Sequence, residues 1–217
     1  MQRVKKWSSL WLVASLLTVL LGACSSEPGY PVLPAGSTVL AFGDSVTYGT
    51  GAADGQDYPT LLAQATDWKV INAGIPGDTA QQARSRLQPL LEQHQPALVI
   101  IELGGNDFLR KRRESAVQED LHHMIEQSQS FGAITVLVAV PRLSLLRAGI
   151  GALSDSDIYQ ELAERTAVIL VPDLFSDILS DETLQADAVH PNAAGYKAFT
   201  TGLIDVLRER GLLAASH

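Results

Sequence analysis

Four polar side chains in this sequence could act together on a carbonyl group. Ser45 stands in a Gly-Asp-Ser sequence directly after an apolar run, while Asp187 and His190 lie three residues apart near the C-terminus. A serine becomes a nucleophile when a neighbouring base takes its proton, and the base works best when a carboxylate holds its other ring nitrogen. We therefore expect His190 to serve Ser45 as base, and Asp187 to orient His190. The fourth side chain, Asn106, could stabilise the charge that this attack creates.

The negative charge that develops on an attacked carbonyl oxygen requires hydrogen-bond donors. Three donors are available: the amide of Ser45, the amide of Gly74 and the side-chain NH2 of Asn106. We interpret the glycine at position 74 as leaving room for substrate, since a Cβ would obstruct its approach. Asp44 and Asp107 are interpreted as structural residues that bond loop amides.

The elements that must position these groups are short apolar runs alternating with longer amphipathic stretches. The expected strands are Thr38–Phe42, Lys69–Asn72, Ala97–Leu103, Ile134–Val140 and Val168–Val171. The expected helices are Tyr58–Thr66, Thr79–Gln93, Glu114–Ser130, Asp157–Arg165 and Asn192–Arg210. Strands that are apolar throughout indicate burial on both faces, so the pattern predicts a three-layer α/β/α fold. Its sheet is expected to be parallel, doubly wound and flavodoxin-like, with about five strands.

This topology predicts that the candidate groups meet. Ser45, Gly74 and Asn106 follow the first three strands, and the pair Asp187 and His190 follows the fifth. In an open parallel sheet, ligands bind outside the carboxyl ends of the strands, where the winding reverses. Local signals support the expected helix starts: Asp78 with Gln81 resembles a capping box, and Asn192 can cap the last helix. Pro191 keeps His190 in extended backbone, outside that helix.

Four sequence blocks resemble those of the SGNH hydrolases, also called the GDSL esterase and lipase family. They are Gly43-Asp44-Ser45, the block centred on Gly74, Gly104-Gly105-Asn106-Asp107 and Asp187-Ala188-Val189-His190. The flanking residues are similar to the TesA-like branch of arylesterases, acyl-CoA thioesterases and lysophospholipases. This resemblance implies a Ser45, Asp187 and His190 triad and an oxyanion hole of Ser45, Gly74 and Asn106. It further implies hydrolysis of small carboxylic ester or thioester substrates through an acyl-enzyme, without a metal or cofactor.

Three features depart from that branch. Val46 replaces the usual leucine after the serine, and Pro76 stands where serine is common. The segment Pro141 to Gly151 also differs, and two interpretations of it stay open: it lines or covers an acyl pocket as a lid, or it is ordinary core.

Two other functions remain as alternatives. One is a carbohydrate or peptidoglycan O-acetylesterase, because the same triad serves acetyl groups on glycans in this family. The other is a non-catalytic envelope lipoprotein that binds lipid or cell-wall polymers. A degenerate, non-catalytic copy is expected to lose a block residue, and none is lost here.

Composition excludes several partners. The 217 residues carry a net charge of −8 and no long basic stretch, which speaks against nucleic acid. The glycines after the first strand do not match a dinucleotide-binding spacing, and there is no phosphate-binding lysine motif. His122 and His123 lack the spacing of a metal site, so we interpret them as surface residues.

The N-terminal residues predict export. A basic start is followed by the apolar stretch Leu10–Leu21 and by Leu21-Gly22-Ala23-Cys24, which resembles a bacterial lipoprotein signal. We expect a signal peptide at 1–23, lipidation of Cys24, a tether at 24–36 and a hydrolase domain at 37–213. Ser25, in place of aspartate, favours the periplasmic face of the outer membrane, with the lipid as the membrane anchor. A plain secretory signal cut near Ala23 is the alternative.

Overall fold

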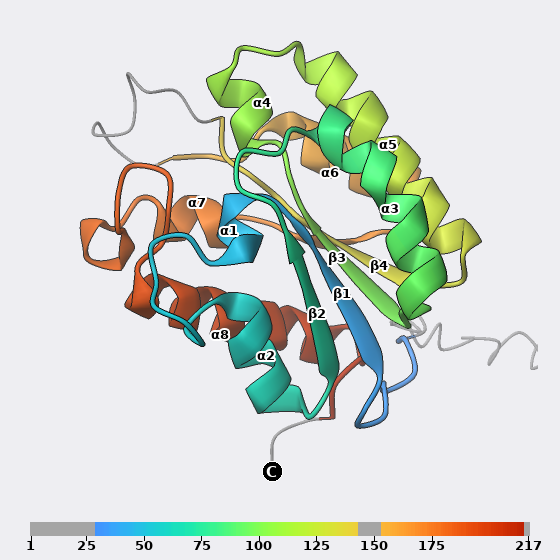
Figure 1. The fold of residues 1–217 in the computed structure, drawn as a ribbon. Helices are drawn as coiled ribbons and strands as arrows, with labels where there is room; N and C mark the ends of the chain where they lie inside the picture. Colours follow the sequence, from blue (N-terminus) through green and yellow to red (C-terminus); the bar gives the residue numbers. More distant parts are fainter. Residues whose placement is uncertain (1–28, 143–152, 215–217) are drawn as a thin grey trace, which may run out of the picture.

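A five-stranded parallel sheet forms the centre of the protein (Figure 1). The structure is a computed structural model and describes residues 29–142 and 153–214. The strands follow the order β2-β1-β3-β4-β5, which is the predicted flavodoxin-like order. Their bounds are β1 Thr38–Gly43, β2 Lys69–Gly74, β3 Leu98–Glu102, β4 Ile134–Val138 and β5 Ile169–Val171.

Helices cover both faces of the sheet, as the sequence predicts. Figure 1 shows α3, α5 and α6 on one side and α2 and α8 on the other. The helices on the first side are α3 Ala80–His94, α5 Glu114–Ser130 and α6 Asp157–Arg165. Those on the second side are α2 Tyr58–Thr66 and α8 Ala193–Glu209. The shorter helices are α1 Ser45–Tyr48, α4 Gly105–Leu109, α7 Leu174–Ile178 and the 3-10 turn η1 Glu182–Leu184.

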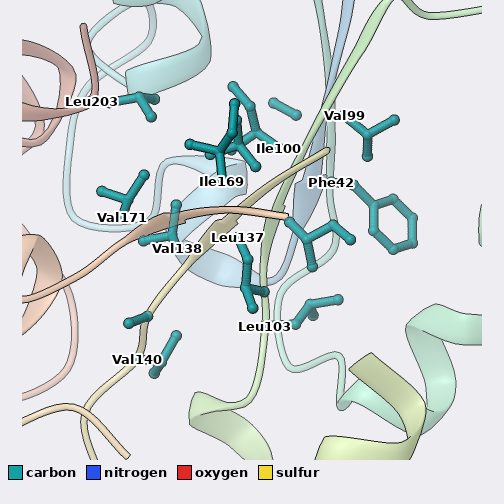
Figure 2. Packing of buried hydrophobic residues seen from close by; sticks show 14 of the residues in the cluster. Phe42, Val99, Ile100, Leu103, Leu137, Val138, Val140, Ile169, Val171 and Leu203 are labelled. Atoms are coloured by element: carbon teal, nitrogen blue, oxygen red, sulfur yellow. The ribbon is translucent and has the colours of Figure 1, made fainter. Parts of the chain in front are cut away.

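The core lies on both faces of the three central strands. Every residue of β3 and all but the first residues of β1 and β4 are buried. Figure 2 shows Phe42, Val99 and Leu137 among the packed apolar side chains. The prediction of strands buried on both faces is wrong for β2, which is partly exposed along its length because it forms an edge of the sheet.

The sequence predicts the five long helices to within a residue or two but places one cap incorrectly. The capping box of α3 is formed by Thr79 and Gln82, not by Asp78 and Gln81. Asp78 instead forms an ion pair with Arg86 at 2.7 Å. The N-cap prediction for α8 is confirmed, since the Asn192 side chain accepts hydrogen bonds from the first turn.

The winding reverses between β1 and β3, which are neighbours in the sheet. In register, Gly43 at the end of β1 lies beside Gly74 on β2 and beside Glu102 on β3. The loops that leave these three residues therefore start side by side. This edge carries the candidate site.

Part of the predicted N-terminal organisation lies outside the described residues, namely the signal peptide 1–23, Cys24 and the first part of the tether. Within the described part, Tyr30 and Leu33 donate backbone hydrogen bonds to the carbonyls of Arg210 and Leu212 just after α8, each 3.0 Å long. Among the residues that the structure describes, no helix is long and apolar enough to cross a bilayer. The division into tether and domain at residue 37 stays a prediction.

Candidate active site

Ser45 is the first residue of α1 and follows the end of β1 after one residue, Asp44. Asp44 caps this short helix by accepting a hydrogen bond of 3.1 Å from the backbone N–H of Val46. The turn is tight because Gly43 has no side chain: a Cβ there would lie 2.6 Å from the carbonyl oxygen of Glu102. The turn places Ser45 at the carboxyl edge of the sheet.

Hydrogen bonds connect Ser45 with His190 and Asp187. Ser45 Oγ lies 2.9 Å from His190 Nε2, although 145 residues separate them in sequence. On the other side of the ring, His190 Nδ1 lies 2.8 Å from Oδ2 and 2.9 Å from Oδ1 of Asp187. A hydrogen on Nδ1 that is donated to this carboxylate leaves Nε2 as the acceptor for the serine proton. The structure thus brings together the three residues that the sequence singled out.

A tight loop before α8 holds this carboxylate and imidazole together. The N–H of Ala186 donates to the carbonyl of His190 at 2.9 Å, which closes the loop. Inside it, Asp187 Oδ1 accepts the backbone N–H groups of Val189 and His190, both at 2.9 Å. Burial alone would raise the pKa of Asp187, but the hydrogen bonds from Val189 and His190, together with the charge of His190, lower it. The carboxylate therefore stays ionised and can stabilise an imidazolium.

Asn192 anchors the same loop from its C-terminal side. Its Oδ1 caps α8 by accepting the N–H groups of Ala194 at 2.9 Å and Gly195 at 3.0 Å. Its Nδ2 donates to the carbonyls of Thr183 at 2.8 Å and Gln185 at 3.0 Å. One side chain therefore fixes both the start of α8 and the segment that enters the loop.

Two of the three predicted oxyanion donors line the pocket beside Ser45 and have a hydrogen without a partner among the described residues. The N–H of Ser45 has no hydrogen-bond partner within the described residues. Asn106, the second residue of α4, donates one hydrogen from Nδ2 to Asp44 Oδ2 at 2.8 Å. Because an amide nitrogen carries two hydrogens, the second remains for a ligand in the pocket that Asn106 lines.

The third predicted donor, Gly74, is arranged differently. Its N–H donates to Oδ1 of Asn72 at 3.0 Å, so it would have to exchange this partner to reach an oxyanion. A Cβ on Gly74 would lie 2.2 Å from the backbone nitrogen of Tyr48 and 2.7 Å from the carbonyl carbon of Thr47. Glycine is required here by the close packing of α1 on β2, so the predicted reason, approach of the substrate, is not what the packing indicates. The donor role of Gly74 stays a prediction.

A buried carboxyl group that was not predicted from the sequence lies next to the site. Glu102, the last residue of β3, is 1% exposed, and Asp44 is 3% exposed. Burial raises the pKa of Asp44 to about 6, and burial followed by the proximity of Asp44 raises the pKa of Glu102 well above its usual value. The available signal was a carboxyl residue at the end of an apolar strand, two positions before the first of the glycines that precede Asn106.

Asp107 has the structural role that we expected. It is fully buried, and its Oδ2 accepts the backbone N–H of Ala80 at the start of α3 at 2.8 Å. Its Oδ1 forms an ion pair with Arg112 at 2.9 Å. The same interpretation is confirmed for Asp44 through its bond to the Val46 amide, although Asp44 also holds Asn106.

Arg86, for which the sequence predicts no role, joins the ends of β1 and β2. Its guanidinium donates to the carbonyls of Gly43 and Ala73, each at 2.7 Å, and to Asp78 at 2.7 Å. The guanidinium carbon also lies 4.2 Å from the centre of the Phe42 ring. Arg86 therefore fixes the two strand ends from which the Ser45 and Gly74 loops start.

A pocket of about 240 Å³ opens beside Ser45, His190 and Asn106. Its apolar wall consists of Val46, Pro76, Leu109, Phe175 and Val189. Of the candidate lid Pro141 to Gly151, residues 143–151 lie outside the described residues. Pro141 is buried and pairs with Asp155, while Arg142 forms ion pairs with Glu114 and Asp157.

Residues 29–142 and 153–214 contain no group of three histidine, cysteine, aspartate or glutamate side chains arranged to hold a metal ion. His122, which we considered as a ligand, lies 3.4 Å from Glu126 on the same helix. The site chemistry described above rests on side chains and backbone amides.

Comparison with known proteins agrees with the geometry. Residues 41–198 match the model of the GDSL-like Lipase/Acylhydrolase family. Thioesterase 1/protease 1/lysophospholipase L1 of Escherichia coli is 35% identical over 164 residues, which cover 73% of this chain and 77% of that protein. The arylesterase of Vibrio mimicus is 34% identical over 186 residues, which cover 81% of this chain and 88% of that protein.

A crystal structure of TesA superimposes with a TM-score of 0.71 at 28% identity, covering 80% of this chain and 99% of that one. A Bacillus subtilis protein named as the lipoprotein YqeF is 30% identical over 142 residues, which cover 59% of this chain and 55% of that protein.

Proposed function

The chain belongs to the GDSL-like lipase/acylhydrolase family and hydrolyses ester bonds, and we propose that Ser45, His190 and Asp187 carry out this reaction. The observation that carries the assignment is the continuous set of hydrogen bonds from Ser45 Oγ through the imidazole to the carboxylate. Each bond is 2.8 to 2.9 Å long, so no rearrangement is needed before attack.

Acylation begins when His190 Nε2 takes the proton of Ser45. The serine oxygen then attacks the carbonyl carbon of the ester or thioester, and the carbonyl oxygen becomes an oxyanion. When the tetrahedral intermediate collapses, His190 returns the proton to the leaving alcohol or thiol, and the acyl group stays on Ser45. Water repeats the sequence with the same base and releases the carboxylic acid. Asp187 holds the imidazole and stabilises its positive charge throughout.

The oxyanion is stabilised by the amide of Ser45 and by the free hydrogen of the Asn106 side chain. Both groups sit at the edge of one pocket, and both belong to short helices that start from β1 and β3. Gly74 is the third candidate, through an exchange of its bond to Asn72. Donors held before the reaction starts are worth more than donors that must reorganise, so we assign the larger share to Ser45 and Asn106.

The acyl group of the substrate is proposed to bind against the apolar wall of the pocket. A pocket of about 240 Å³ with this apolar wall has room for a short or medium acyl chain. A panel of p-nitrophenyl esters from acetate to laurate tests this directly. We expect kcat/KM to be highest for butyrate to octanoate, whereas activity confined to acetate would favour the O-acetylesterase alternative.

We propose that the protein is exported and held at the membrane through Cys24, most simply at the periplasmic face of the outer membrane. The support is the lipobox-like sequence ending at Cys24 and the lipoprotein name of the Bacillus subtilis relative. The variant Cys24→Ala should move from the membrane fraction to the soluble fraction. Unchanged fractionation would contradict anchoring through this cysteine.

Replacement of the nucleophile tests the proposed function. Ser45→Ala should lower kcat on p-nitrophenyl butyrate by 10⁴-fold or more, on the order seen for removal of a triad member. Ser85→Ala, at an exposed serine on α3, is the matched control and should leave kcat within about 2-fold. Hydrolysis by Ser45→Ala at a tenth of the wild-type rate or more would overturn the assignment.

A further inference from the structure

A chain of buried polar groups leads from the protein core to Asn106. The hydroxyl of Tyr58 on α2 lies 3.1 Å from the hydroxyl of Thr47, which donates to Glu102 Oε2 at 3.2 Å. Glu102 pairs in register with the residue before Asp44, so the two buried carboxyl groups are neighbours. Burial raises both pKa values, and the interaction between the two side chains further raises the pKa of Glu102 and lowers that of Asp44, as expected if Glu102 donates a hydrogen bond to Asp44. Asp44 Oδ2 then accepts the hydrogen bond from Asn106 Nδ2 at 2.8 Å. The proposed oxyanion donor therefore stands at the exposed end of a continuous network.

Two carboxyl groups in contact inside a protein cannot both be ionised, and a hydrogen bond between them requires a hydrogen on one of them. Among the described residues, no lysine or arginine forms an ion pair with either group; the cation whose charge acts on Asp44 is protonated His190. Asp44 accepts two N–H groups, from Val46 and Asn106, which is the pattern of an anion. The hydrogen therefore belongs on Glu102, which donates it to Asp44.

We propose that Glu102 is a positioning residue: it shares one proton with Asp44 and so keeps Asp44 as the anionic acceptor that fixes the Asn106 amide. This rests on the proposed roles of Ser45 and Asn106 in ester hydrolysis. The torsion of an asparagine amide is broad, so an unheld NH2 samples many directions. A charge-assisted bond to Asp44 holds one hydrogen and thereby directs the other toward the oxyanion.

The titratable groups that surround the pair are few within the described structure. Tyr58 on α2, Tyr159 on α6 and Tyr196 on α8 act on it electrostatically, and burial raises the pKa of all three, so they stay neutral. His190 acts on Asp44 from the loop before α8. A change in the pH profile on replacing Glu102 must therefore come from the pair itself or from its effect on His190.

A double-mutant cycle tests whether Glu102 acts through Asn106. Glu102→Leu keeps a comparable volume but removes the donor to Asp44. A hydrogen bond to a charged group is worth about 1.5–3 kcal/mol, so kcat on p-nitrophenyl butyrate should fall about 10-fold or more, with KM within about 3-fold. In the Asn106→Ala background the same change should cost less than about 3-fold. An equal loss in both backgrounds would overturn the proposal.

A conservative variant provides the second arm. Glu102→Gln keeps a neutral donor to Asp44 and should restore most of the kcat that Glu102→Leu loses, with an acid limb of the pH profile like that of the wild type. In Glu102→Leu the anion of Asp44 loses a hydrogen-bond donor, so Asp44 takes up a proton at a higher pH. The acid limb of the pH profile should therefore move to higher pH by about one unit. If Glu102 were ionised in the native enzyme, both variants would remove a negative charge that repels the anion of Asp44. The acid limb of the pH profile would then move to lower pH, and this result would refute proton sharing.

Failure of the proposed function would be distinguishable, because the activities of Ser45→Ala and Asn106→Ala alone test the roles of Ser45 and Asn106. Thermal unfolding of each variant shows whether it folds. Should Glu102→Leu not fold, the pH profile of Glu102→Gln still decides, because an acid limb displaced downward by half a unit or more contradicts a protonated Glu102.

Discussion

Replacement of Asp187 by asparagine should inactivate the enzyme while leaving its loop intact. Asp187 Oδ1 accepts two backbone N–H groups, and Oδ2 faces His190 Nδ1 at 2.8 Å. An asparagine oxygen can keep the backbone bonds, which places its NH2 against Nδ1. The amide then donates to Nδ1, so the ring proton must move to Nε2, where it faces Ser45 and blocks proton transfer.

The magnitude follows from this inverted tautomer. The corresponding substitution in a serine protease triad lowers kcat by about 10⁴-fold, and we expect about 10³- to 10⁴-fold here because Asp187 is 55% exposed and water competes for the ring nitrogens. Since Asp187 is not among the residues that line the pocket, KM should change by less than about 3-fold.

The assay is steady-state hydrolysis of p-nitrophenyl butyrate together with thermal unfolding. Asp205→Asn, at an exposed aspartate on α8, is the control and should keep kcat within about 2-fold. Asp187→Asn should melt within about 3 °C of the wild type because the loop bonds remain. If it retained more than a tenth of the wild-type kcat, the role of Asp187 in setting the tautomer would be refuted.

Three further predictions concern the groups around the triad. Asn106→Ala should lower kcat about 10²-fold or more through loss of an oxyanion donor, and a loss below 3-fold would contradict that role. Arg86→Met should lower the free energy of unfolding, measured in urea, by about 3–5 kcal/mol. The substitution breaks a mostly buried ion pair and leaves the carbonyls of Gly43 and Ala73 without their donor. The control is Arg208→Met, at an arginine whose ion pair is exposed. Glu102→Gln should stabilise the protein more at pH 7 than at pH 4. In the folded state the pKa of Glu102 lies well above its ordinary value of 4.5, whereas in the unfolded state it does not. The contribution of Glu102 to the free energy of unfolding is therefore complete below pH 4.5. Above that pH it falls by about 1.4 kcal/mol per pH unit until the folded-state pKa is reached. If thermal unfolding showed that the stabilisation by Glu102→Gln does not rise with pH, Glu102 would ionise normally in the wild type.

The sequence predicts the main elements because their signals are local. β1, β3 and β4 consist mostly of apolar residues, and the bounds of α2, α5 and α6 agree with the predicted ones. The helices α1, α4 and α7 were not predicted, since four or five residues are too short to show helical periodicity. Their placement depends on tertiary contacts, such as the packing of α1 on Gly74.

The candidate site shows the same division between local and non-local information. Spacing and strand order place Ser45, Asp187 and His190 at one edge, and the structure brings their side chains into contact. Glu102 was not predicted, although a carboxyl residue ends an apolar strand there, because its importance lies in its burial beside Asp44, which depends on how β1 and β3 pair. The bond from Gly74 to Asn72 was missed because a strand residue two positions away gives no sign of where its side chain turns.

The most direct test of the central claim is to identify the atom that carries the acyl group. The full-length protein treated with a fluorophosphonate probe should gain one adduct by intact mass, and peptide mapping should place it on Ser45. His190→Ala should slow labelling by at least 10²-fold, because the serine loses its base. A stoichiometric adduct on any other residue, or labelling of Ser45→Ala at the wild-type rate, would contradict the assignment of Ser45 as the nucleophile.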